Sequence, residues 1–172
     1  MHPTISRILF WPTYTWNLLL GRVFRLRPWW SHVEDQILLG ARPSGGDAKR
    51  LSQLGVTGVI NMCQEYPGPK RQYESLGIEQ LWLPTVDFNP PTLEFVRMGV
   101  DFIHRKLEEG GKVYIHCKAG RARSATVLLC YLVKHRGMTP EEAQAFLLSK
   151  RPHISKNLVE RPVVQAFAKE CN

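Results

Sequence analysis

The sequence predicts a single α/β domain in which a central, mostly parallel sheet is flanked by helices. Its 172 residues have the length of one domain with an ordinary hydrophobic core. Short β-branched segments alternate with helical patterns, and this alternation is typical of strands joined by crossover helices. Glycine and proline mark the boundaries between the segments, and no internal repeat or second domain is recognisable.

The first elements are expected within residues 36–62. Residues 36–40 form an apolar run that predicts a strand. Residues 47–54 predict a helix that ends at Gly55, because glycine accepts the left-handed conformation that follows many helices. Residues 56–62 are apolar and rich in β-branched side chains, so they predict a buried strand.

The next elements lead to a long helix. Residues 64–72 contain prolines and a glycine, and they predict a loop before a short helix that runs toward Gly77. Residues 80–83 predict a strand. Residues 92–109 predict an amphipathic helix, because apolar side chains recur along one face at helical spacing.

The last part of the chain predicts one strand and three helices. Residues 111–115 read as a buried strand and residues 124–136 as an apolar helix. The sequence Thr-Pro-Glu-Glu at 139–142 predicts a helix start, with threonine as the cap and the second glutamate at the capping-box position. A final helix is expected at 157–170, where Pro162 lies in the first turn or causes a kink.

The run between the strand at 111–115 and the next helix carries the strongest chemical signal. A strand–loop–helix turn directs several backbone N–H groups, together with the positive end of the helix dipole, at one point. Such a turn binds an anion. The candidate site residues of this loop are His116, Cys117, Lys118, Ala119, Gly120, Arg121, Ala122, Arg123 and Ser124.

Cys117 is the predicted nucleophile. Near a helix N-terminus and an arginine, the pKa of a cysteine falls from ~8.5 into the range of about 3.5–7.5, so a thiolate forms at neutral pH. Arg123 offers a planar fork to two phosphoryl oxygens, and Gly120 lets the backbone approach them closely. Ser124 is expected to donate to the sulfur, and His116 to support the loop. These groups suit attack of sulfur on phosphorus through a cysteinyl-phosphate.

The leaving oxygen needs a proton donor on a loop that faces the site. Asp87 is the best candidate, because it follows the predicted strand at 80–83 and precedes two prolines that stiffen the loop. It is expected to act first as general acid and then as general base on water. A helix-capping or solvated aspartate is the structural alternative. Asp101 is the weaker candidate, because it falls within a helical pattern.

These residues resemble the catalytic loop of the cysteine-dependent dual-specificity phosphatases, and more narrowly that of the mitochondrial phosphatidylglycerophosphate phosphatase group. The resemblance extends from about Leu9 to Ala168. Other segments that carry it are Trp30-Ser31-His32-Val33, Leu38-Leu39-Gly40-Ala41-Arg42-Pro43, Gly58-Val59-Ile60, Glu65-Tyr66, Gly77-Ile78-Glu79-Gln80-Leu81, Thr85-Val86-Asp87, Thr139-Pro140-Glu141-Glu142-Ala143 and His153-Ile154-Ser155. The chain departs from the group at Gln64-Glu65-Tyr66-Pro67, where the group usually has Glu-Glu-Tyr-Glu.

The resemblance implies a phosphomonoesterase of phospholipid biosynthesis that converts phosphatidylglycerophosphate to phosphatidylglycerol. It implies a peripheral enzyme of the mitochondrial inner membrane in a eukaryote, or of the cytoplasmic face of the inner membrane in a bacterium. Lys118 and Arg121 favour a phospholipid, because they add positive charge for its second phosphate. For Arg121 a solvated surface position is an equal alternative. A protein tyrosine or dual-specificity phosphatase with a phosphoprotein substrate is the first alternative function, and a phosphate-binding module without turnover is the second.

Residues 1–33 form a predicted arm ahead of a phosphatase domain at 34–172. The arm has no Asp or Glu, and its apolar run is too short and interrupted to predict a membrane-spanning helix. Its arginines are Arg7, Arg22, Arg25 and Arg27, and aromatic and aliphatic residues lie between them. This mixture suits the headgroup zone of a bilayer, so we expect the arm to contact a membrane surface. A targeting segment and an arm packed on its own domain are the alternatives.

The formal net charge of +8 favours anionic partners. We do not expect nucleic acid, because the basic residues are spread along the chain without a reading motif. Cysteines 63, 117, 130 and 171 have no paired spacing, which indicates a reducing compartment. Cys63 is a candidate redox partner of Cys117, with simple burial as the default interpretation. The histidines lack ligand spacing, so we expect no metal and no cofactor.

Overall fold

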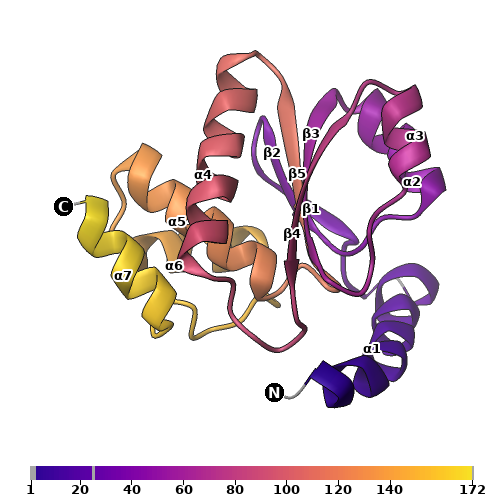
Figure 1. Ribbon diagram of the computed structural model, residues 1–172, viewed down its shortest axis with the longest axis horizontal. Helices are drawn as coiled ribbons and strands as arrows, with labels where there is room; N and C mark the ends of the chain where they lie inside the picture. The colour runs from indigo at the N-terminus through magenta and orange to yellow at the C-terminus, as the bar shows by residue number, and fades with distance from the viewer. Residues whose placement is uncertain (1–2, 25, 172) are drawn as a thin grey trace.

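The computed structural model describes residues 3–24 and 26–171, and it confirms the predicted fold class. A five-stranded sheet with the order β1-β2-β5-β3-β4 lies at the centre (Figure 1). The strands are β1 (Trp30–Glu34), β2 (Ile37–Gly40), β3 (Val56–Cys63), β4 (Glu79–Thr85) and β5 (Lys112–His116). β1 is antiparallel to β2, and the other neighbouring strands are parallel.

Helices cover both faces of the sheet (Figure 1). The described helices are α1 (Pro3–Leu18), the π-helical η1 (Leu19–Val23), α2 (Gly45–Gln53), α3 (Lys70–Ser75), α4 (Leu93–Glu108), α5 (Arg123–Arg136), α6 (Pro140–Lys150) and α7 (Pro162–Cys171). α2 and α3 pack on one face and α4 and α5 on the other, where α6 and α7 pack against α5. The larger hydrophobic core lies on the side of α4 to α7, and a smaller one lies under α2 and α3.

The helix starts follow from local capping. The side chain of Thr139 accepts the N–H of Glu142, whose carboxylate accepts the N–H of Thr139, so the predicted capping box of α6 is confirmed. A second capping box joins Ser44 and Asp47, and it starts α2 two residues before the predicted position. Both caps satisfy backbone groups that a helix end would otherwise leave without a partner.

Other differences from the sequence prediction concern β1, α3 and α7. β1 was not predicted, and it lies partly within the expected arm, because its apolar and aromatic residues resemble the rest of that segment. α3 begins at Lys70, inside the expected loop. α7 begins at Pro162 rather than at residue 157, because proline lacks an N–H and fits only the first turn of a helix without disrupting it.

The arm packs against the domain through a small cluster of Tyr14, Trp29 and Ala41. The Arg42 guanidinium lies between two aromatic rings, 4.1 Å from the ring centroid of Tyr14 and 4.3 Å from that of Tyr66. This stacking joins α1 to the loop after β3. Residues 1–2 and Arg25 of the expected arm lie outside the described residues.

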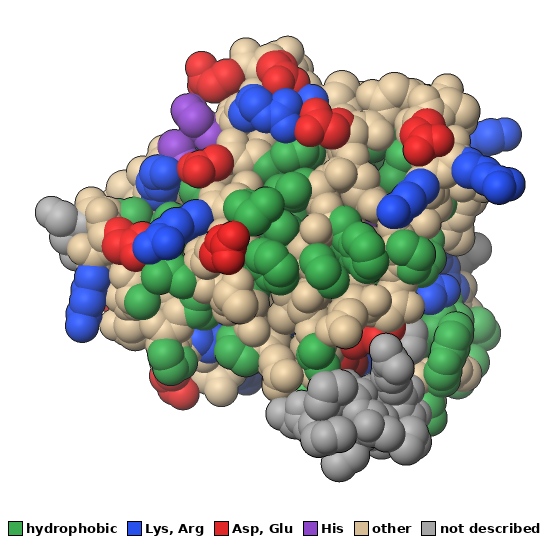
Figure 2. Space-filling view, in the orientation of Figure 1, with side chains coloured by type: hydrophobic (Ala, Val, Ile, Leu, Met, Phe, Trp, Pro, Cys, Tyr) green, Lys and Arg blue, Asp and Glu red, His purple; other side chains and the backbone are tan. Residues whose placement is uncertain are grey.

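The outer side of the arm exposes large apolar side chains. Trp11 is 62% exposed, and the other members of this set are Trp16, Val23, Phe24 and Leu26. Figure 2 shows hydrophobic side chains on the surface at the end of the molecule where α1 lies. Among the described helices, none has both the length and the apolar character that a membrane span requires.

Candidate active site

The candidate site lies at the carboxyl edge of the parallel strands, where ligands bind in open α/β sheets. The loop 117–122 connects the central strand β5 to α5. Glu65 follows β3, and Asp87 follows β4. Because β3 and β5 are neighbours and β4 lies beside β3, the topology brings these three segments together.

Glycine and a buried arginine determine the shape of the loop. Gly120 has φ +64°, and a Cβ at this position would collide with the backbone of Gly40. Arg151, 1% exposed at the end of α6, donates from Nε to Gly120 O at 2.9 Å and from Nη2 to Ala119 O at 3.1 Å. Because these carbonyls face Arg151, the loop can direct its N–H groups to the opposite side.

The Cys117 thiol faces the backbone N–H groups of Arg121 and Ser124, and Cys117 is 4% exposed. The Ser124 hydroxyl lies 3.3 Å from Sγ and donates to it. Burial raises the pKa of Cys117, but the Arg123 charge, the Ser124 hydroxyl and the N–H groups of Ser124 and Arg121 outweigh burial and lower it to about 6. Cys117 is therefore mainly a thiolate at neutral pH.

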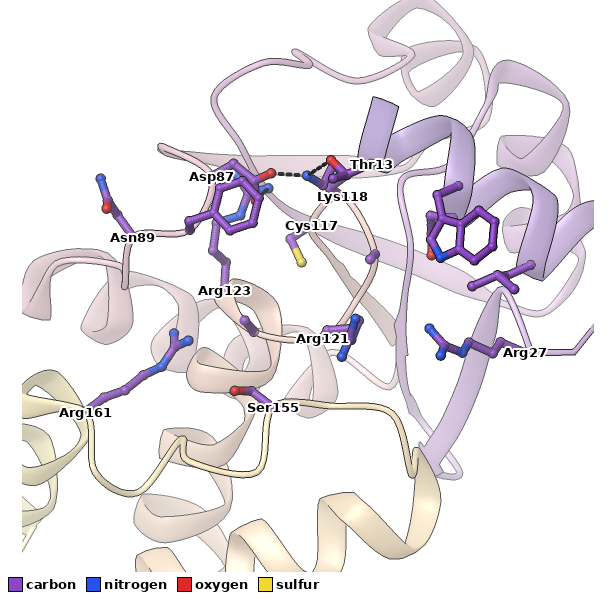
Figure 3. A pocket seen from close by; sticks show the side chains of 16 residues that line it. Thr13, Arg27, Asp87, Asn89, Cys117, Lys118, Arg121, Arg123, Ser155 and Arg161 are labelled. Carbon is purple, nitrogen blue, oxygen red and sulfur yellow. Dashed lines mark hydrogen bonds and ion pairs between the residues drawn. The ribbon is translucent and has the colours of Figure 1, made fainter. Parts of the chain in front are cut away.

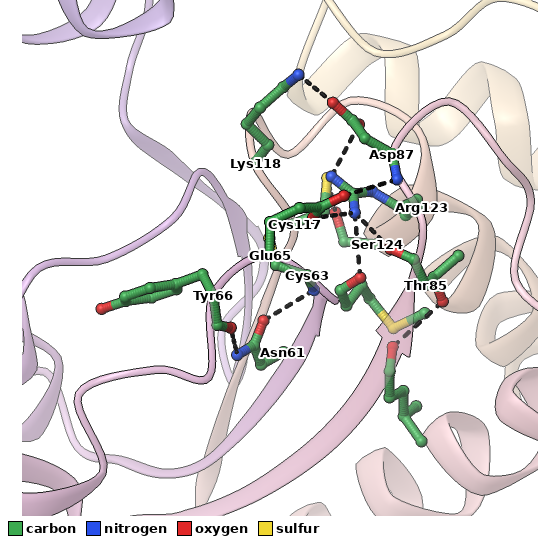
Figure 4. A network of polar contacts seen from close by, with 12 residues as sticks. Asn61, Cys63, Glu65, Tyr66, Thr85, Asp87, Cys117, Lys118, Arg123 and Ser124 are labelled. Carbon is green, nitrogen blue, oxygen red and sulfur yellow. Dashed lines mark hydrogen bonds and ion pairs between the residues drawn. The ribbon is translucent and has the colours of Figure 1, made fainter. Parts of the chain in front are cut away.

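Acceptors at and just beyond the carboxyl ends of β3 and β4 hold Arg123 (Figure 4). Its Nη1 donates to Thr85 O at 2.6 Å and to Glu65 Oε2 at 3.1 Å, and its Nη2 donates to Asp87 Oδ1 at 2.8 Å. Among the described residues, Nε of Arg123 makes no hydrogen bond. The guanidinium is thus fixed in orientation and keeps one edge for an anionic ligand.

Asp87 lies on the same side of the site as the thiol, and it is 7% exposed (Figure 3). Its Oδ2 accepts from Lys118 Nζ, which also donates to Thr13 Oγ1 at 2.7 Å. The Asp87 N–H donates to Glu65 Oε1 at 2.9 Å, which fixes the loop. The charge of Lys118 is therefore directed at Asp87 rather than at open solvent.

Of the other predicted residues, His116 and Cys63 lie beside this centre and Asp101 does not. His116 is buried, and burial lowers its pKa to about 3, so the imidazole is neutral; its Nδ1 lies 3.3 Å from Cys117 O. Cys63 is buried at the end of β3, and burial raises the pKa of its thiol. Asp101, the weaker acid candidate, lies on the surface of α4 and pairs with Lys134 at 3.0 Å.

A cavity of about 330 Å³ opens above Cys117 (Figure 3). Loop residues Lys118, Ala119, Arg121 and Ala122 line it together with Arg123 and Asp87. The connection between α6 and α7 adds Ser155 and Arg161. The arm adds Thr13, Trp16, Asn17, Leu20 and Arg27. Within the described part of the chain, no cluster of His, Cys, Asp or Glu is arranged to hold a metal ion.

The sequence did not predict that Glu65, Arg27, Arg151 and Arg161 lie at this site. Glu65 had a signal, because it follows a predicted strand of the parallel sheet and lies at 64–67, where the resembled group usually has Glu-Glu-Tyr-Glu. Arg151 had none, since its acceptors lie far away in the chain. The arm arginine Arg27 was considered only as a membrane contact.

Comparison with known proteins gives one family. The model of the dual specificity phosphatase catalytic domain matches residues 37–164. Phosphatidylglycerophosphate phosphatase PTPMT1 of Arabidopsis thaliana is 41% identical over 152 residues, which cover 87% of this chain and 45% of the relative. PTPMT2 of the same plant is 38% identical over 95% of this chain and 73% of its own length. The chain thus spans less than half of the first relative.

A rat relative and solved structures agree with this family. Phosphatidylglycerophosphatase and protein-tyrosine phosphatase 1 of Rattus norvegicus is 37% identical over 96% of this chain and 91% of the relative. The crystal structure of PTPMT1 in complex with PI(5)P is similar, with a TM-score of 0.77 and 37% identity over 84% of this chain and 97% of the solved chain. That of Tk-PTP in the active form has a TM-score of 0.74 and 25% identity, covering 83% and 97% of the two chains.

Proposed function

The chain belongs to the dual specificity phosphatase family, and we propose that this cysteine-based phosphatase converts phosphatidylglycerophosphate to phosphatidylglycerol and inorganic phosphate. The names of three similar proteins include phosphatidylglycerophosphate phosphatase activity. The observation that carries the proposal is the Cys117 thiol, whose pKa is about 6, at the floor of a cavity that Asp87 also lines.

In the proposed first step, Cys117 Sγ attacks phosphorus and the bond from phosphorus to the leaving oxygen breaks. The loop N–H groups and the free edge of Arg123 bind the non-bridging oxygens. Asp87, carrying a proton, donates it to the leaving oxygen. The products of this step are the alcohol and a cysteinyl-phosphate.

In the proposed second step, water attacks the phosphorus of the cysteinyl-phosphate. Asp87 now accepts a proton from this water, and the sulfur leaves as a thiolate that Ser124 stabilises by its hydrogen bond. Inorganic phosphate then dissociates. His116 is buried and neutral, so we assign it no proton transfer and propose that it supports the loop.

A phosphoprotein substrate is the second candidate function. The name of the rat relative includes protein-tyrosine phosphatase, which favours this candidate. The cations that line the cavity favour a substrate with more negative charge than one monoester carries, and this supports the phospholipid.

We propose that residues 1–33 act as a peripheral membrane arm on the domain at 34–172. The exposed Trp11, Phe24 and Leu26 support this, because such side chains favour the headgroup zone over water. The corresponding location is the mitochondrial inner membrane in a eukaryotic cell or the cytoplasmic face of the inner membrane in a bacterium. Sedimentation with phosphatidylglycerol vesicles tests the arm: the double change Trp11→Ala and Phe24→Ala should weaken binding at least about tenfold. Met98→Ala, a change of an exposed side chain on α4, should not weaken it.

Phosphate release from a substrate panel tests the function. The full chain is assayed on phosphatidylglycerophosphate in micelles, PI(5)P and a phosphotyrosyl peptide. We expect the highest kcat/KM for phosphatidylglycerophosphate, no turnover in Cys117→Ser and normal turnover in Cys171→Ser, a matched change at an exposed cysteine. A higher kcat/KM for the peptide would refute the lipid assignment, and turnover by Cys117→Ser would refute the mechanism.

A further inference from the structure

Two arginines enter the cavity from different parts of the chain. Arg121 belongs to the catalytic loop, and its Nε donates to His153 O at 2.7 Å. Arg27 belongs to the arm segment between η1 and β1. Both line the cavity that contains Cys117, and in Figure 3 the guanidinium of Arg27 points toward Arg121.

Neither of these two charges has an acidic partner among the residues that the structure describes. Within the described part of the chain, neither Arg27 nor Arg121 forms an ion pair with a carboxylate, and residues 1–33 contain no Asp or Glu. The carboxylates of the site are paired with Lys118 and Arg123. The cavity therefore has balanced charge near the thiolate and excess positive charge beside Arg27 and Arg121.

His153 is affected by the same excess of charge. Burial, followed by the charges of three arginines, lowers the pKa of His153 to about 3. Those arginines are Arg151, Arg27 and Arg121. Like charges gathered at a partly buried place repel one another, and an anion that binds between them removes this repulsion.

We propose that Arg27 and Arg121 bind the phosphodiester group of the substrate, the second anion next to the monoester that Cys117 attacks. This inference rests on the proposed function. In phosphatidylglycerophosphate the two phosphates are joined by one glycerol, so a ligand with its monoester at Cys117 carries its second anion within the same cavity. Trp16 and Leu20 line the cavity as well and provide apolar contact for the lipid part beyond the phosphodiester.

Arg161 also lines the cavity, on the segment between α6 and α7. Arg161 donates from Nη1 to Thr126 Oγ1 at 3.0 Å, and its charge interacts with the Cys117 thiolate. It therefore lies near the phosphoryl group that is transferred. We therefore expect a change at Arg161 to lower kcat/KM for every monoester. A change at Arg27 should lower kcat/KM only for substrates that carry a second anion.

The test uses two water-soluble substrates, so that attraction of the arm to a lipid surface plays no part. The first is the deacylated head group, in which one glycerol joins a phosphodiester and a phosphomonoester, and the second is glycerol 3-phosphate. We expect the full chain to prefer the head group by kcat/KM. Arg27→Gln should lower this preference by about 10- to 100-fold, the range for a charge-assisted hydrogen bond. Arg27→Lys should restore part of it.

Two matched changes complete the test. Arg50→Gln removes the same charge from an exposed position on α2 and should keep the preference. Arg161→Gln should lower both kcat/KM values together. The phosphodiester site would be overturned if Arg27→Gln preferred the head group as strongly as the unchanged protein does. It would also be overturned if Arg161→Gln, rather than Arg27→Gln, lost this preference. Absence of phosphate release from phosphatidylglycerophosphate micelles by the unchanged protein would overturn the proposed function and this inference with it.

Discussion

Removing the Ser124 hydroxyl should raise the pKa of the Cys117 thiol. In Ser124→Ala the sulfur loses the donor that lies 3.3 Å away, while the backbone donors and Arg123 remain. A hydrogen bond to a charged group contributes about 1.5–3 kcal/mol, and a pKa difference of one corresponds to about 1.4 kcal/mol. The pKa should therefore rise from about 6 to about 7–8.

Alkylation by iodoacetamide measures this value directly, because only the thiolate reacts. The rate at the peptide that contains Cys117 is followed by mass spectrometry across pH 4 to 9. Ser149→Ala, which removes a hydroxyl on the surface of α6, serves as the control and should keep the midpoint near 6. If Ser124→Ala and the control share one midpoint, the hydrogen bond does not stabilise the thiolate and the reasoning is wrong.

Four further changes test other parts of the site. Gly120→Ala should lower the free energy of unfolding in urea by at least about 1–2 kcal/mol and abolish turnover, because Gly120 has a positive φ and contacts the backbone of Gly40. A stable, active variant would contradict this. Asp87→Asn should lower kcat by about 10²–10⁴-fold on the lipid but less on 4-nitrophenyl phosphate, and equal losses would indicate another acid. Arg151→Met should raise the midpoint of Cys117 alkylation and lower kcat/KM, with partial recovery in Arg151→Lys; an unchanged midpoint would argue against a positioning role. If Cys63 is the redox partner of Cys117, peroxide-treated protein should recover activity with dithiothreitol and Cys63→Ser should not, whereas equal recovery would exclude the pair.

The fold could be predicted from the sequence wherever the signal was local. The capping box at Thr139 and Glu142 lies within four residues, and the start of α6 was predicted correctly. β1 was missed because a strand of this kind is defined by pairing with β2, and its own residues resemble the aromatic arm. The start of α7 was misplaced because Pro162 allowed two interpretations.

In the candidate site too, residues with a local sequence signal were predicted and residues placed by distant contacts were not. Cys117, Arg123 and Ser124 were proposed together, because they lie in one short loop between a strand and a helix. The bonds from Arg151 to the loop carbonyls could not be predicted, since nothing in its neighbourhood of the chain specifies a distant acceptor. Arg27 belongs to the site only through the packing of the arm, which no local pattern describes.

The contact between Gly40 and Gly120 restricts how this protein can vary. At Gly120 an added methyl group would meet main-chain atoms of Gly40, and at Gly40 it would meet the Tyr114 hydroxyl and the Trp30 Cβ. Every residue type has the same main-chain atoms, so no substitution at another position makes room for a side chain at Gly120. Suppressor screens that begin from a larger residue there should therefore return only reversion to glycine.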